Sequence, residues 1–159
     1  MFKSLAIQIF VFLLIFQGIS MLRETSMLGY SESVTEHNLP TLTGEVVGVS
    51  ATDRPLVVYF FAPWCKVCHM SIKNLQKIYE EHGDIDVIAV ALDFTDKYEV
   101  EEFVGSHQLT FPVALGNETI KSDYQISGYP SYYVINEQNI ITSKSLGYST
   151  ELGLQLRVL

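Results

Sequence analysis

The sequence predicts an α/β fold in which a central mixed sheet is flanked by helices. The first observation is a continuous apolar run at 56–61, LVVYFF, which is typical of a strand buried on both faces. The second is that strands and helices alternate after this run, which indicates parallel strands joined by right-handed crossovers. The third is that the last two apolar runs are separated only by NEQN, which indicates an antiparallel hairpin and makes the sheet mixed.

Length and charge restrict the function. The chain has 159 residues, enough for one domain with a core of its own. It carries 10 Lys and Arg against 18 Asp and Glu, a formal net charge of -8. Because affinity for nucleic acid comes mostly from cationic side chains that neutralise phosphates, we expect no nucleic-acid partner.

The hydrophobic excess is concentrated in residues 1–22. No charged residue occurs between Lys3 and Arg23, and the stretch Ser4 to Leu22 is mostly apolar. Since about 20 apolar residues span a bilayer, we expect a transmembrane signal-anchor, with a cleaved signal peptide as the alternative. Lys3 then places the amino terminus in the cytoplasm and the rest of the chain outside it.

A polar segment follows the apolar one. Residues 23–38 are rich in Ser, Thr and Glu, and we expect a linker there that holds the domain away from the membrane. The domain itself is expected at 39–159. It opens with LPTLTGEVVGVS, which alternates around Gly44 and predicts a β-hairpin ahead of the main sheet.

The first helix is predicted directly after the buried strand. From Lys66 to His82, apolar residues recur at helical spacing along one face, and Gly83 stands where a C-cap belongs. Asp96, with Glu99 three residues later, resembles a capping box. The elements expected after the first helix are a strand at 85–92, a helix at 97–107, a strand at 111–115, a short helix near 120–124, strands at 131–135 and 140–146, and a closing helix that presents Leu152, Leu156 and Leu159.

The only two cysteines stand at the first strand-to-helix junction. A thiolate at Cys65 would be stabilised by the helix N-terminus and by the charge of Lys66, so we expect Cys65 to attack substrate disulfides. Cys68 lies one turn further along and can resolve the mixed disulfide. A purely structural disulfide is the alternative, but so short a loop would remove little unfolded-state entropy.

A metal site is a second alternative at this junction. Cys65, Cys68 and His69 are three close donors of the kind that bind Cu(I) or Zn. A second ligand cluster is missing, so we expect no bound metal. We expect His69 either to add positive charge near the thiols or to face solvent, and we expect surface positions for the other histidines, His37, His82 and His107.

Three separated features resemble one known fold. A strand ending in FFAPWCKVC, a long helix after it, and Gly128-Tyr129-Pro130 before a later strand are similar to the thioredoxin fold, from about Leu39 to Leu159. The leading hairpin and the apolar amino terminus resemble the membrane-anchored periplasmic branch, the TlpA/DsbE/ResA-like thiol-disulfide oxidoreductases. Within that branch the sequence is most similar to the suppressor-of-copper-sensitivity D type.

The resemblance implies further site residues. Pro130 would be a cis-proline that faces the two cysteines, and Tyr129 would contact the backbone of extended substrates. Trp64 would lie on the rim of the docking surface with Pro63, rather than in the core. No cofactor is implied beyond the redox-active disulfide of Cys65 and Cys68.

The sequence also departs from the family pattern. Tyr59 stands where thioredoxin has a buried Asp that accepts a proton, and Lys73 stands where thioredoxin has a helix-kinking Pro. Asp93 and Asp96 lie in the loop where related proteins place an acidic site residue. For these two, a solvated loop acid and a helix cap are the favoured interpretations.

These observations predict a thiol-disulfide oxidoreductase in the bacterial inner membrane, with a single membrane pass and its domain in the periplasm. The resemblance favours net reduction of protein disulfides, with electrons from a membrane thiol reductant of the DsbD kind. A net oxidase or isomerase is the alternative within the same class, because Lys66 favours the thiolate. From another class, the alternative is a copper-binding or chaperone module that uses Cys65, Cys68 and His69.

Overall fold

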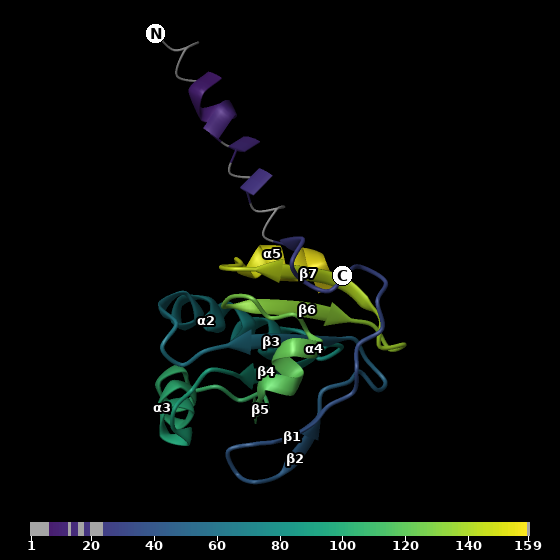
Figure 1. Cartoon of the computed structure of the whole chain (residues 1–159), viewed down its shortest axis with the longest axis vertical. Coiled ribbons are helices and arrows are strands. Elements are labelled where there is room, and N and C mark those ends of the chain that lie inside the picture. The colour runs from purple at the N-terminus through teal and green to yellow at the C-terminus, as the bar shows by residue number, and fades with distance from the viewer. Residues whose placement is uncertain (1–6, 13, 16–17, 20–23, 159) are drawn as a thin grey trace.

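The centre of the molecule is a five-stranded mixed sheet. A computed structural model describes residues 7–12, 14–15, 18–19 and 24–158. The strand order is β5-β4-β3-β6-β7, in which β3 and β4 and also β4 and β5 are parallel, and β6 is antiparallel to both of its neighbours (Figure 1). The strands are β3 (Leu56–Phe61), β4 (Asp86–Ala91), β5 (Val113–Leu115), β6 (Ser131–Ile135) and β7 (Ile141–Leu146). The predicted fold class is confirmed.

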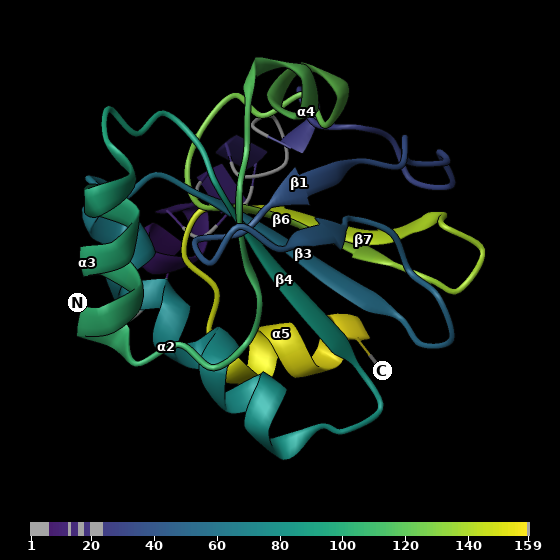
Figure 2. The same cartoon turned by 90° about the horizontal axis from the view of Figure 1, so that it is seen from below.

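Helices cover both faces of this sheet. Figure 2 shows α2, α3 and α5 on one face and α4 on the other. The helices are α2 (Lys66–Glu81), α3 (Lys97–His107), α4 (Glu118–Asp123) and α5 (Glu151–Val158). All six residues of β3 are buried, as the continuous apolar run predicts. Successive residues face opposite sides, so Val57, Tyr59 and Phe61 pack towards α2, whereas Leu56, Val58 and Phe60 pack towards α4.

The strand directions bring three connections to the same end of the sheet. β3 and β4 run in parallel and end side by side, with Phe61 opposite Ala91. β6 runs the other way and begins at Ser131, opposite Phe60. The loops that follow β3 and β4 and the loop that precedes β6 therefore meet, although they are far apart in the sequence.

The predicted hairpin is present and lies beside the sheet. β1 (Asn38–Pro40) pairs with β2 (Val46–Gly48) in antiparallel register. The turn between them closes at Gly44, whose φ of 89° suits glycine. Thr41 forms an isolated bridge with Ala114 of β5, which places the hairpin at the β5 edge.

The segment predicted as a linker differs from a free tether. It runs along one side of the domain from β7 towards β1 (Figure 1), and Ser33 bridges Ile140. Met27 is only 4% exposed, and the buried amine of Lys144 donates to the carbonyl oxygens of Met27 at 3.2 Å and Leu28 at 2.8 Å. The few apolar residues of this polar segment are thus sufficient to pack it onto the domain.

Two helix ends differ from the sequence-based expectation. α2 ends at Glu81, and its cap residue is His82 in extended backbone, not Gly83. α4 begins at Glu118, two residues before the predicted apolar start. The reason is the side chain of Asn117, which caps α4 by accepting a hydrogen bond from the amide of Ile120 at 3.1 Å.

The predicted signal-anchor lies partly outside the described residues, at 1–6, 13, 16–17 and 20–22. Among the helices that the structure does describe, none has both the length and the apolar character needed to cross a membrane. The anchor therefore stays a prediction.

Candidate active site

Cys65 occupies the N-cap position of α2. Its Sγ accepts a hydrogen bond from the backbone amide of Cys68 at 3.2 Å, and both cysteines are free thiols. Cys65 is 8% exposed, whereas Cys68 is completely buried behind it. A disulfide approaching from outside can therefore meet Cys65 but not Cys68. The backbone amide of Cys68, which donates to Cys65 Sγ, would also stabilise a thiolate at Cys65.

Burial raises the pKa of Cys68 well above the ordinary value of a thiol. Hydrogen bonding to Cys65 raises this pKa further, while the backbone at Ala62 and the hydroxyl of Tyr59 act in the opposite direction. Cys68 is thus a thiol at neutral pH until something near it stabilises the thiolate.

Trp64 lies on the surface next to the nucleophile. The side chain is 63% exposed, and its indole nitrogen donates to the backbone carbonyl of Asp93 at 2.8 Å. Its ring meets that of Tyr129 edge to face, with 5.9 Å between the centroids. The structure therefore places Trp64 at the rim, where the resemblance expects it, and Pro63 behind it is buried.

Tyr129 and Pro130 lie opposite, in the loop before β6. The peptide bond between them is cis, as the resemblance implies. Pro130 is buried, and its carbonyl oxygen accepts from the amide of Gly147 at 2.7 Å. The phenol of Tyr129 donates to Asp93 Oδ2 at 2.9 Å. Trp64 and Tyr129, which form the two walls of the site, thus both donate a hydrogen bond to Asp93.

Asp93 has more contacts in the site than a solvated loop acid would. It is exposed in the loop after β4, as predicted, but its carboxylate forms an ion pair with Lys121, with 2.6 Å between Nζ and Oδ1. Burial acts to raise the pKa of Asp93, but hydrogen bonds from Lys121 and Tyr129 outweigh it, so that the pKa is lowered. The signal available in the sequence was its place directly after a buried strand. Asp96, by contrast, is a helix cap, as favoured, since it accepts from the amide of Tyr98 at 2.9 Å.

His69 does not face solvent, the second of the two expectations, because it is partly buried and both of its ring nitrogens are engaged. Its Nε2 lies 2.8 Å from the carbonyl oxygen of Pro63, so that nitrogen carries the proton, and its Nδ1 lies 2.7 Å from Nε2 of His107. His69 therefore ties α2 to the loop of the nucleophile and to α3. The expected surface position of His107 is wrong for the same reason, because its ring is half-buried in this contact.

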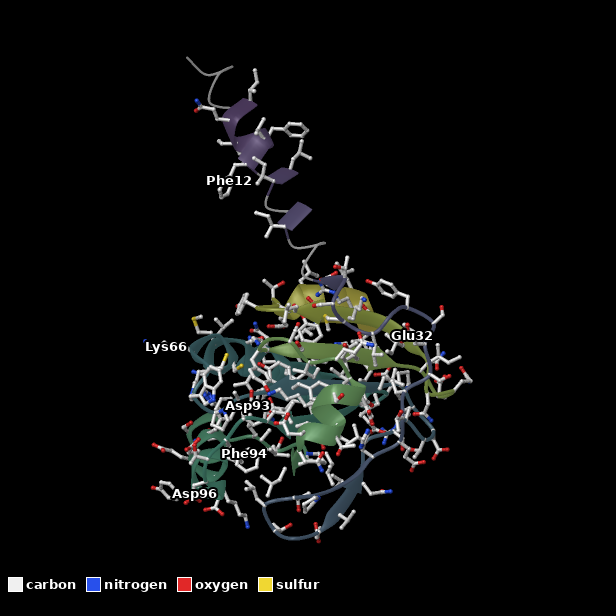
Figure 3. The ribbon with its side chains drawn as sticks, viewed as in Figure 1. Phe12, Glu32, Lys66, Asp93, Phe94 and Asp96 are labelled. Carbon is white, nitrogen blue, oxygen red and sulfur yellow. The ribbon has the colours of Figure 1, made fainter. Side chains whose placement is uncertain are left out.

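Lys66 is the first residue of α2 and lies at the left edge of the molecule in Figure 3. Its side chain is exposed. A cleft of about 560 Å³ lies next to Trp64, between the cysteine loop and α3. Its lining includes Trp64, His69, Glu102 and His107. Within the described part of the chain, no three His, Cys, Asp or Glu side chains are grouped so that they could hold a metal ion.

Comparison with known proteins agrees with this geometry. The model of the AhpC/TSA family matches residues 31–144, which include both cysteines and Pro130. The chain is 28% identical over 131 residues to the thioredoxin-like protein YneN of Bacillus subtilis, covering 80% of this chain and 77% of that protein. It is 27% identical over 143 residues to the thiol-disulfide oxidoreductase ResA of Oceanobacillus iheyensis, covering 84% of this chain and 74% of that protein.

Solved structures share the fold. StoA from Bacillus subtilis superposes with a TM-score of 0.71 at 22% identity, covering 79% of this chain and 97% of that one. A DsbF homologue from Corynebacterium diphtheriae superposes with a TM-score of 0.74 at 20% identity, covering 84% and 91%. With a thioredoxin-like fold and a family match over most of its length, this chain belongs to the AhpC/TSA family.

Proposed function

We propose that this chain is a thiol-disulfide oxidoreductase that reduces disulfides in proteins. Cys65 attacks a substrate disulfide and forms a mixed disulfide, and Cys68 then attacks Sγ of Cys65 and releases the reduced substrate. The observation that carries this proposal is the pair itself, an N-cap thiol at the surface with a second, buried thiol bonded to it through its backbone amide. The relatives named above as thioredoxin-like or as thiol-disulfide oxidoreductases support it.

The direction of transfer depends on how strongly the reduced form is stabilised. Strong disulfide oxidants owe their potential to a stabilised reduced form, usually through a thiolate at the nucleophilic cysteine. Here Lys66, the cation directly after Cys65, is exposed rather than packed on the thiols. This exposure favours a reductase over the alternative, a net oxidase or isomerase.

The alternative from another class, a copper-binding or chaperone module, has less support. Copper binding at this junction would need His69 beside the two thiols. Both ring nitrogens of His69 are already engaged, by Pro63 and by His107. Only the two cysteines of this set are then left to bind copper, and their arrangement, one thiol at the surface and one buried behind it, suits disulfide exchange.

The cellular setting belongs to the same proposal. The apolar stretch of residues 4–22 and the exposed side chains of Ile7, Phe10 and Leu14 support a signal-anchor in the bacterial inner membrane, with the domain in the periplasm. A membrane thiol reductant of the DsbD kind would then supply electrons. The finer relationship to the suppressor-of-copper-sensitivity D type is part of this proposal.

The exchange mechanism is tested with the variant Cys68→Ala. Without the resolving thiol, the mixed disulfide between Cys65 and its substrate persists, so non-reducing gels of cells expressing this variant should show adducts that disappear on reduction. Cys65→Ala is the matched control and should show none. Absence of adducts with Cys68→Ala would contradict the mechanism.

The direction is tested by trapping the thiol state of the wild-type chain in cells. A reductase is expected to be mainly reduced, and to become oxidised when the membrane reductant is deleted. A pool that is oxidised in both strains identifies an oxidase instead.

A further inference from the structure

The hydroxyl of Tyr59 is buried close to the cysteine pair. Tyr59 is 1% exposed, in the middle of β3 on the face covered by α2. Within the described part of the chain its hydroxyl makes no hydrogen bond of ordinary geometry, although Ser71 and Cys68 lie close enough to act on it. A buried, unpaired hydroxyl destabilises the fold, and phenylalanine would fill the same space without that cost. A role of the hydroxyl in the chemistry of the site would explain why this position holds tyrosine rather than phenylalanine.

The surroundings of this hydroxyl show what it can do. Its ring lies between those of Phe61 and Tyr132, at centroid distances of 6.2 Å and 6.3 Å. The titratable groups facing it are Cys65 and Cys68 from the start of α2 and Tyr132 from β6, and the Ser71 hydroxyl also lies close. Burial, and then the charge of a Cys68 thiolate, raise the pKa of Tyr59 well above its ordinary value. Tyr59 therefore keeps its proton and can donate it in a hydrogen bond to a thiolate.

We propose that the Tyr59 hydroxyl donates a hydrogen bond to the thiolate of Cys68 when that thiolate forms, and thereby speeds the release of the substrate. This inference rests on the proposed exchange function. The position that holds a proton acceptor in thioredoxin is, in this chain, a donor that stabilises the product of deprotonation. It acts on the resolving cysteine rather than on the nucleophile.

Tyr59 acts in the step that resolves the mixed disulfide. In the mixed disulfide, Cys68 loses its proton to solvent, and Tyr59 donates to the resulting thiolate while keeping its own proton. The thiolate attacks Sγ of Cys65, the bond between Cys65 and the substrate sulfur breaks, and the bond between Cys65 and Cys68 forms. The substrate leaves as a thiolate and takes up a proton, so two electrons have passed from the dithiol to the substrate.

The size of the effect follows from two opposing terms. A hydrogen bond to an anion shifts an ionisation equilibrium by roughly 10- to 100-fold. The same hydrogen bond makes the thiolate a weaker nucleophile. On a logarithmic scale, this loss of nucleophilicity cancels about half of the gain in thiolate population. Loss of the donor should therefore slow the resolving step by roughly 3- to 10-fold at neutral pH.

The experiment follows the two sulfur attacks separately in the full chain. The reduced chain is mixed with dithiobis(nitrobenzoic acid) in a stopped-flow instrument. Attack by Cys65 releases one nitrothiobenzoate and leaves a mixed disulfide, and attack by Cys68 releases the second. In Tyr59→Phe the first release should stay within about twofold of wild type, while the second slows by roughly 3- to 10-fold.

The chain offers a matched control. The hydroxyl of Tyr124 is also buried and finds no partner among the residues that the structure describes, but it lies on the opposite face of the sheet, in the core on the α4 side. Tyr124→Phe removes an equivalent oxygen atom and should leave both releases unchanged. Ser71→Ala tests whether the neighbouring hydroxyl is the donor, and it too should leave the second release unchanged.

The outcomes separate this inference from the proposed function. A wild-type chain that releases only one nitrothiobenzoate contradicts the exchange mechanism and the role of Tyr59 with it. A wild-type chain that releases both, with an equally fast second release in Tyr59→Phe, overturns the role of Tyr59 alone. A slow second release in Ser71→Ala with a normal one in Tyr59→Phe assigns the donor to Ser71 and also overturns it. Urea unfolding of each variant shows that the comparison is between folded proteins.

Discussion

Asp93 connects three parts of the site through one residue. Its carbonyl oxygen accepts from Trp64, and its two carboxylate oxygens bind Lys121 and Tyr129 separately. Trp64 precedes the nucleophile, and Tyr129 precedes the cis-proline. Asp93 therefore sets the distance between the two walls that a substrate would contact.

Replacing Asp93 by Asn should widen this distance without removing a reacting group. The amide has no charge to pair with Lys121, and it has only one oxygen to accept hydrogen bonds. We expect KM for a disulfide-bonded protein substrate to rise several-fold, with kcat nearly unchanged, in a steady-state reduction assay. Stability should change by only about 0–1 kcal/mol, because the ion pair is partly exposed.

Asp53→Asn is the control for Asp93→Asn, because Asp53 is exposed in the loop before β3, at the other end of that strand. It should leave KM unchanged. If KM is the same in Asp93→Asn as in the wild type, the two walls are held by other contacts.

At the scale of elements, the pair His69 and His107 connects α2 to α3. The nitrogen of His107 that faces His69 is hydrogen bonded, whereas its Nδ1 is buried without a partner in the part of the chain described. Burial lowers the pKa of His107, and the charges of His69 and Lys73 lower it further. Its place between the helices therefore favours the neutral form of His107.

This lowered pKa makes stability depend on pH. Because the unfolded chain binds a proton at His107 more readily than the folded chain does, folding is most favourable above the ordinary histidine pKa of about 6.5 and weakens as pH falls below it. Urea unfolding between about pH 7.5 and pH 5.5 should show this loss. His107→Gln should flatten the dependence, and an equally steep dependence in that variant would contradict the assignment.

The elements show which parts of the structure the sequence could predict. The run LVVYFF predicts β3 because a strand buried on both faces is apolar throughout. The helical spacing after it predicts α2 because a helix buried on one face repeats its apolar residues every three to four positions. The start of α4 was missed because a polar cap, Asn117, determines it. The cysteine pair and Pro130 were found by motif. The contacts of Asp93 and His107 were not, since they join residues 28 to 38 positions apart that only the tertiary fold brings together.

At the scale of the whole molecule, the segment before β1 is part of the domain. Met27 and Leu39 are buried in the core on the α4 side, and Lys144 holds the backbone at Met27 and Leu28. The sequence did not predict this, because the polar composition of 23–38 resembles that of a linker. A domain boundary drawn at residue 39 would remove part of the core.

Met27→Ala tests whether this packing contributes to stability. Truncation of a buried Met leaves a cavity, and we expect the free energy of unfolding in urea to fall by about 2–5 kcal/mol. Met70→Ala is the matched control, because Met70 is 60% exposed on α2, and it should stay within about 0.5 kcal/mol of wild type. Equal stability of the two variants would show that the segment is bound only loosely.

The path of this same segment has a consequence for self-association. The segment pairs with Ile141, at the start of the outer strand β7, and the hairpin that follows it pairs through Thr41 with Ala114 in the opposite outer strand, β5. Unpaired outer strands are the usual templates on which further copies add to a sheet and form aggregates. The segment and the hairpin each cover part of one outer strand, and we expect this cover to reduce polymerisation of the protein through its sheet.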